Sequence, residues 1–133
     1  MQVKSLIFSL LMLPFVLAAQ GNDIVQSKKI SYLQVINKLE TTFSKAPNQV
    51  IPLRDQIVEM MNADIESSNV KTEEMMKKPG RNDEQRIAMQ NQMAVTAKQK
   101  YIKKNFVQLE WNDPKMNQET ALALVRNFMN ILN

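Results

Sequence analysis

Apolar residues recur every three or four positions in four segments of this chain, the spacing that places them on one side of an α-helix. The first segment covers about residues 23–44, and Ala46-Pro47-Asn48 ends it. Its apolar stripe consists of Val25, Tyr32, Leu33, Ile36, Leu39 and Phe43. We therefore expect an amphipathic helix that packs through this stripe.

The second segment begins at Pro52, a favourable first-turn residue, and stays in phase to Lys78. Its stripe consists of Leu53, Ile57, Met60, Met61, Ile65, Met75 and Met76. Ile57 and Met75 are about five full turns apart, which favours one continuous helix. A break at Ser67-Ser68-Asn69 is the alternative.

A turn signal, Pro79-Gly80-Arg81, separates this segment from the third, for which Asn82 or Asp83 can provide the N-cap. The third helix should reach about Glu110. Its stripe consists of Ile87, Ala88, Ala94, Val95, Tyr101, Ile102, Phe106 and Leu109. Because only a short turn joins them, helices 52–78 and 83–110 should form an antiparallel hairpin.

The fourth helix should start with Asp113 as its cap and Pro114 at its first position, and reach Leu132. Its stripe consists of Ala121, Leu122, Val125, Phe128, Met129 and Leu132. The sequence thus predicts an all-α fold: a small four-helix bundle with a long central antiparallel hairpin at about 52–78 and 83–110.

The first eighteen residues have the pattern of a secretory signal peptide: Lys4, an apolar run over residues 6–17, and then Ala18-Ala19-Gln20-Gly21. That run has about twelve residues, whereas a membrane-spanning helix needs about twenty. We expect cleavage after Ala18, a periplasmic or secreted product with one all-helical domain (19–133), and no transmembrane segment after cleavage. The chain has no N-x-[ST] sequon, which favours a bacterial source.

The composition removes most catalytic chemistry. The 133-residue chain contains neither histidine nor cysteine, so disulfides, thiolate metal sites and the commonest general base are excluded. We expect no enzymatic activity, no cofactor and no metal. The formal net charge is +4, an excess too small to indicate a nucleic-acid partner.

Acidic residues line the second helix opposite its apolar stripe, namely Asp55, Glu59, Glu66 and Glu73. Such residues could bind a divalent cation or act as paired carboxylates. Carboxylates one or two helical turns apart lack the converging backbone oxygens of a calcium loop, so we interpret them as a solvated face.

Asp64 and Lys98 are charged residues that interrupt the apolar stripes of the predicted hairpin. If the hairpin turns around residues 79–82, Asp64 lies level with Ala97 and next to Lys98. We therefore predict a partly buried interhelical ion pair that fixes the register of the two helices.

Four lysines, Lys98, Lys100, Lys103 and Lys104, surround Tyr101 on the third helix. Helical spacing spreads them over different faces, so a solvated surface is the simplest interpretation. Contact with an anionic partner or membrane surface is the alternative.

Methionine is unusually frequent, with ten in the chain. Adjacent Met-Met pairs point about 100° apart on a helix, which does not favour a Cu(I) site. Met89 and Met93 form an i, i+4 pair away from the main stripe of their helix. Either that helix is buried on two sides, or the pair belongs to a methionine-rich surface that adapts to partners.

In architecture, this small exported, cysteine-free helical chain rich in Met, Gln and Lys resembles periplasmic stress chaperones of the Spy and CpxP kind, although it lacks their Leu-Thr-x-x-Gln repeats. We hypothesise a non-enzymatic protein-binding module of the bacterial envelope, chaperone-like or adaptor, whose partner is another protein. The contact residues we expect are Met89, Met93, Lys100, Lys104 and Trp111. The alternatives are an immunity or inhibitor protein against one secreted toxin or enzyme, and a self-associating structural subunit of a secretion apparatus.

Overall fold

The computed structural model describes residues 20–80, 82–113 and 117–132. These residues form four α-helices and one short 3-10 helix, with no strand among them. The elements are α2 (Gln20–Lys45), η1 (Pro47–Gln49), α3 (Val50–Met76), α4 (Asp83–Val107) and α5 (Gln118–Asn130). The all-α prediction is confirmed, whereas the predicted signal peptide lies outside the described residues.

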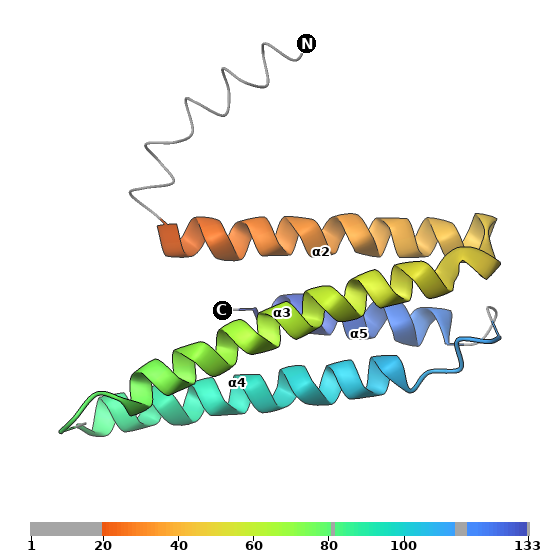
Figure 1. Ribbon diagram of the computed structural model, residues 1–133. Helices are drawn as coiled ribbons and strands as arrows, with labels where there is room; N and C mark the ends of the chain where they lie inside the picture. Colours follow the sequence, from red (N-terminus) through yellow and green to blue (C-terminus); the bar gives the residue numbers. More distant parts are fainter. Residues whose placement is uncertain (1–19, 81, 114–116, 133) are drawn as a thin grey trace, which may run out of the picture.

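The four helices pack as a bundle in which α3 contacts α2 and α4, and α5 contacts α2 and α4. Figure 1 shows the α3–α4 hairpin projecting beyond the beginning of α2. The last buried residue of α3 is Ser68 and the first of α4 is Gln92, whose side-chain amide donates a hydrogen bond to the Ser68 carbonyl at 3.4 Å. None of the described residues between these two is buried. The end of the hairpin is therefore a two-helix projection.

The central hairpin forms largely as its sequence predicts. Helix α3 continues through residues 67–69 without a break. Asn82 caps α4 in a capping box: its side chain accepts from the Gln85 backbone N–H, and the Gln85 side chain accepts from the Asn82 N–H, both at 2.9 Å. In the turn, Gly80 has a φ of +64°, a conformation that glycine adopts without strain.

The hydrophobic core comes mainly from the stripes of α2, α3 and α5. Its buried members there are Tyr32, Val35, Ile36, Leu39, Phe43, Val50, Leu53, Ile57, Met61, Ile65, Ala121, Leu122, Val125 and Phe128, joined by Leu132. Leu33 and Met76, which we placed in stripes, are exposed instead. Leu33 is rotated away from the contact with α5 and α3, and Met76 lies on the projecting end of the hairpin.

The predicted stripe of α4 is only partly confirmed: Phe106 is buried and Ile102 and Leu109 pack partly buried against the core, but the stripe also contains exposed residues. The buried residues of this helix are Gln92, Thr96, Gln99 and Phe106, whereas Ile87 and Tyr101 are 56% and 67% exposed. The buried residues follow the i, i+4, i+7, i+14 spacing of one helix face. Three of the four side chains on this buried face are polar. Apolar periodicity alone therefore does not give the inward face of α4.

Gln99 offers a test of this polar contact. Its side-chain oxygen is buried and has no hydrogen-bond partner among the described residues. Because an unsatisfied buried acceptor is costly, Gln99→Leu should raise the free energy of unfolding by about 1 kcal/mol in urea titrations. The matched change Gln92→Leu removes the bond to Ser68 and should give no gain. Equal effects of the two substitutions would contradict this explanation.

The last helix begins later than expected. Its N-cap is Asn117, with a left-handed φ of 62°, so α5 starts at Gln118. The predicted capping residue, Asp113, lies in the connecting segment, where its backbone N–H donates to the Glu110 carbonyl at 3.2 Å. Pro114 lies outside the described residues. The α5 stripe itself is confirmed, with Met129 partly buried.

Candidate functional site: a groove between α3 and α4

An open groove of about 670 Å³ runs between α3 and the second half of α4. We call it the α3–α4 groove. Its lining residues are Val58, Ile65, Lys100, Lys103, Lys104, Val107 and Gln108. The groove therefore combines apolar side chains from both helices with three lysines from one of them.

Helical spacing explains why these residues meet. Val58 and Ile65 are seven residues apart on α3, while Lys100, Lys104 and Val107 follow each other by four and three residues on α4. Such positions lie on one side of a helix. The antiparallel packing of α3 against α4 brings the two rows together.

A polar contact crosses the groove and holds one of the lysines. Lys103 Nζ donates to the side-chain oxygen of Asn62 at 2.8 Å. Asn62 lies between Val58 and Ile65 in α3, so the ammonium group is held beside the apolar part of the groove. Because the acceptor is neutral, the lysine charge is not cancelled by this contact.

The charge of the groove is uniformly positive. Its lining residues include no aspartate or glutamate, and none of the ion pairs within the described residues involves Lys100, Lys103 or Lys104. Three ammonium groups close together repel one another modestly at the surface and attract an anionic group. The groove is thus suited to a ligand that carries both apolar and acidic groups.

The structure brings together part of the predicted contact set. Lys100 and Lys104 line the groove, joined by Lys103. Met93 is 51% exposed and Met89 is partly exposed, and both lie on the groove side of α4 by their spacing to Lys100. Met93 therefore lies on the surface and Met89 is partly buried, while their contact with a partner stays a prediction.

Sequence reasoning missed the α3 side of the groove. It assigned Ile65 to the core stripe, which is confirmed, but it did not single out Val58 or Asn62. The lysine spacing on α4 signals a groove, because long side chains at i, i+3 and i+4 can reach one groove even when their Cα atoms point in different directions, but it does not identify the α3 residues opposite.

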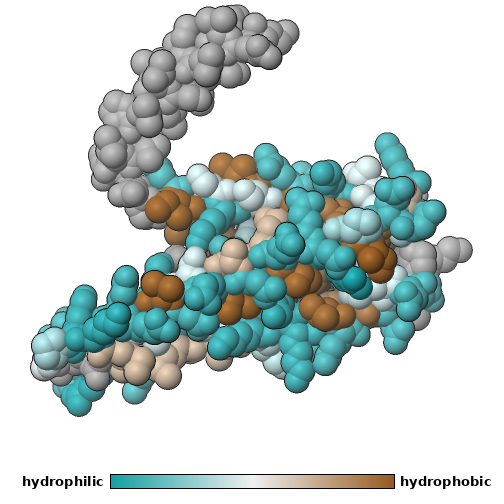
Figure 2. Space-filling view, viewed as in Figure 1, coloured by the Kyte–Doolittle hydropathy of each residue, from teal (hydrophilic) through white to brown (hydrophobic). Residues whose placement is uncertain are grey.

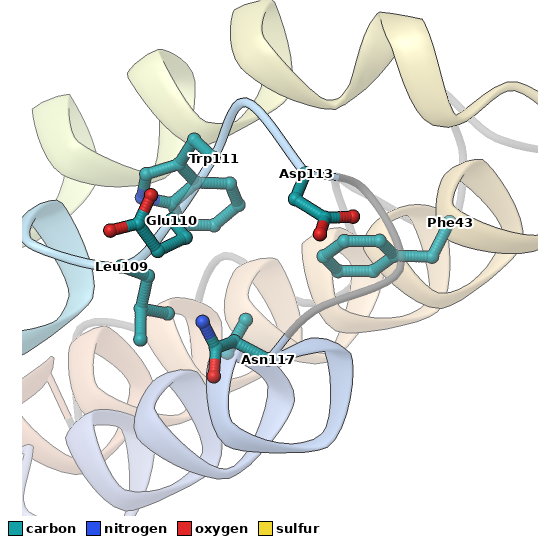
Figure 3. Close-up of a pocket in the computed structure, with 7 residues that line it drawn as sticks. Phe43, Leu109, Glu110, Trp111, Asp113 and Asn117 are labelled. Atoms are coloured by element: carbon teal, nitrogen blue, oxygen red, sulfur yellow. The ribbon is translucent and has the colours of Figure 1, made fainter.

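Trp111 does not join this group. Its ring forms an edge-to-face contact with Phe106 at 4.9 Å and stacks near Phe43 at 6.4 Å, and its indole N–H donates to the Phe106 carbonyl at 2.9 Å. Figure 3 shows Phe43 extending from α2 toward the segment that carries Trp111. Trp111 therefore anchors the α4–α5 connection inside the fold.

The small pocket beside Trp111 is too small to be a ligand site. It has about 10 Å³ available and is lined by residues that include Phe43, Leu109 and Asn117 (Figure 3). That volume corresponds to about one water molecule.

The predicted ion pair between Asp64 and Lys98 is not formed. Asp64 is buried as expected, but its carboxylate accepts a hydrogen bond from the Tyr32 hydroxyl at 2.6 Å and lies 3.2 Å from Lys28 Nζ, both on α2. Lys98 is exposed. The register of the hairpin is close to the prediction, since Ser68 lies opposite Gln92, but Asp64 faces α2, and Lys98 is rotated away from the buried face of α4.

Tyr32 is almost fully buried in this arrangement, with 1% of its surface exposed. Burial raises the pKa of its hydroxyl, and the hydrogen bond to Asp64 and the negative charge of that carboxylate raise it further. The contact therefore keeps Tyr32 protonated as the hydrogen-bond donor. This buried polar pair ties α2 to α3.

The acidic residues that line α3 are spread along its exposed face. Asp55, Glu59, Glu66 and Glu73 are all exposed on α3, and no three acidic residues in the described part of the chain come close enough together to hold a metal ion. None of the helices in that part of the chain has the length and apolar character to cross a membrane.

Among known protein families, curated proteins and solved structures, no match to this chain was found.

Proposed function

We propose that this chain is an exported, non-enzymatic protein-binding module of the bacterial envelope, chaperone-like or adaptor, that binds its partner through the α3–α4 groove. The observation that carries the proposal is the meeting of Lys100, Lys103 and Lys104 with Val58, Ile65 and Val107 in one open groove. A lysine cluster with no acidic residue in the groove lining, beside apolar side chains, fits an amphipathic, acidic surface.

The face of the molecule drawn in Figure 2 supports this choice. Figure 2 shows hydrophobic patches dispersed among hydrophilic side chains on the face it presents, not one large apolar area. Dispersed apolar residues are normal on a protein surface and do not by themselves mark an interface. The groove adds what they lack, namely a concave shape and a single sign of charge.

The proposal predicts that charge reversal in the groove removes the partner. The mature chain (residues 19–133), tagged, would be used to capture proteins from envelope extract of its source organism, with mass spectrometry as the readout. The double variant Lys100→Glu, Lys104→Glu should reduce recovery of the partner at least about tenfold, equivalent to about 1.4 kcal/mol. Both residues are exposed, so stability should change by less than about 0.5 kcal/mol.

The matched control is Lys38→Glu, Lys45→Glu, which makes the same charge change at exposed positions of α2. This variant should recover the partner at the wild-type level. A partner retained by the groove variant, or lost equally from both variants, would contradict the assignment of the groove.

A further inference from the structure

We infer that the occupant of the α3–α4 groove is an acidic amphipathic helix of another protein. The helix would place apolar side chains on Val58, Ile65 and Val107 and direct carboxylates toward Lys100, Lys103 and Lys104. This inference rests on the proposed function and specifies the chemistry of its partner.

The shape of the groove fits a helix. Two antiparallel helices form parallel ridges, and a third helix can lie between such ridges at an interaxial distance of about 8–10 Å. Apolar residues at i, i+3, i+4 and i+7 of an amphipathic helix form the stripe that enters a groove of this kind. Lys100 and Lys104 are about one turn apart on α4, so carboxylates about one turn apart on the occupant can reach both.

The charges of the groove select an acidic occupant. Each of the three lysines lacks an ion-pair partner within the described residues, and Lys103 is held across the groove by the neutral side chain of Asn62. A carboxylate in the place of the Asn62 contact would make a stronger, charge-assisted hydrogen bond. The full chain, with these three lysines included, has a formal net charge of +4, so its acidic residues do not outnumber its basic ones.

The surface continues beyond the lysines along the same side of α4. Met93, which is 51% exposed, lies about two turns before Lys100, and Met89 lies one turn further. Thioether side chains adapt to apolar surfaces of different shapes. The stretch from Met93 to Val107 is about 21 Å long at 1.5 Å per residue, enough for a helix of about four turns.

An anionic membrane fits this geometry less well. A protein that lies on a bilayer inserts apolar residues from a convex or flat face between its basic residues. Here Val58 and Ile65 line a concave groove, with Ile65 only 7% exposed, so they can meet an inserted ridge but not a flat lipid surface. A small anionic amphiphile would need a more enclosed site to bury most of its surface.

The test uses helical peptides of eighteen residues with one leucine stripe and either Glu, Gln or Lys on both flanks of that stripe. Binding of each fluorescent peptide to the full mature chain (residues 19–133) is measured by anisotropy. The Glu peptide should bind at least about tenfold more tightly than the Gln peptide, the Lys peptide should show no binding, and added salt should weaken the Glu complex. Lys100→Glu, Lys104→Glu should abolish binding, while Lys38→Glu, Lys45→Glu should not change it.

Equal affinities for the Glu and Gln peptides, or no binding of either, would overturn the inference. So would tight binding to phosphatidylglycerol vesicles in the absence of peptide binding, which would assign the groove to a membrane surface. Self-association that Lys100→Glu, Lys104→Glu abolishes, measured by sedimentation without any peptide binding, would assign it to a second copy. Capture of a partner that depends on the groove lysines, combined with peptide failure, would leave the proposed function standing and overturn only the acidic-helix inference.

Discussion

Replacing Phe106 with alanine should lower the free energy of unfolding by about 3–5 kcal/mol, the usual cost of deleting a large buried aromatic side chain. Phe106 is fully buried and is the one buried hydrophobic residue of α4. Its ring also meets Trp111 edge to face at 4.9 Å. The substitution therefore opens a cavity where α4, its connection to α5 and the core all meet.

Urea denaturation followed by circular dichroism gives the measurement, because a shift of the midpoint at constant slope reports stability alone. Ile87→Ala is the matched control: Ile87 lies on the same helix but is 56% exposed, so the change should be within about 0.5 kcal/mol. Similar losses for the two variants would mean that α4 is held by its exposed apolar face in solution. That result would also support the prediction that Ile87 belongs to the packed stripe of α4.

Hydrogen exchange distinguishes a local effect from a global one in the same variant. The other buried residues of α4 are Gln92, Thr96 and Gln99, which contribute little apolar burial. Without Phe106, the amide protection of α4 should therefore fall further than that of α2 and α5. A uniform loss in all helices would show that α4 unfolds only together with the core.

The sequence was sufficient where the apolar stripe and the packing face coincide. The stripes of α2, α3 and α5 consist of large aliphatic and aromatic residues, and most of these residues are buried. The limits of the hairpin were also predictable, because Asn82 and Gly80 carry local conformational preferences that need no tertiary context. These features depend on short-range chemistry.

The inward face of α4 and the partner of Asp64 depend instead on tertiary packing. Asp64 interrupts the apolar stripe of α3, a helix that contacts both α2 and α4. The sequence spacing predicted which α4 residues lie level with Asp64, but not whether its side chain points toward α4 or α2. The Tyr32 hydroxyl on α2 donates a hydrogen bond to this carboxylate. The register of α2 relative to α3 is not determined by a short turn of known geometry. A prediction based on one hairpin could not find this hydrogen bond.

Only the α4 side of the candidate groove was predictable, because its α3 side also depends on tertiary packing. Lys100 and Lys104 stand out in the sequence as part of a lysine cluster, but Val58 and Asn62 acquire their significance only when α3 lies beside them. Trp111 is the opposite case, a predicted contact residue whose packing within the fold the sequence did not indicate. An isolated tryptophan after a helix is a reasonable binding anchor, yet here it packs on Phe106 and Phe43, with the Arg54 guanidinium 5.8 Å from its ring centre.

Tyr32→Phe should cost about 1.5–3 kcal/mol at neutral pH, the usual value of a hydrogen bond to a charged group, because it removes the 2.6 Å bond to Asp64. The cost should depend on pH in a defined direction. Burial, followed by the Asp64 hydrogen bond and charge, raises the pKa of Tyr32 in the folded state above the value of about 10 in the unfolded chain. The folded state therefore holds its proton at a pH where the unfolded state releases it, and the contribution of Tyr32 is complete below pH about 10 and declines above it.

The difference in unfolding free energy between the wild type and Tyr32→Phe should thus be constant from neutral pH to about 10, and then narrow by up to about 1.4 kcal/mol per pH unit. Taking the difference cancels the titration of the lysines, which both proteins share. Tyr101→Phe is the matched control, because the chain has two tyrosines and Tyr101 is 67% exposed. A constant difference across the alkaline range would show that folding does not raise the pKa of Tyr32, and would contradict a buried hydroxyl bonded to the Asp64 carboxylate.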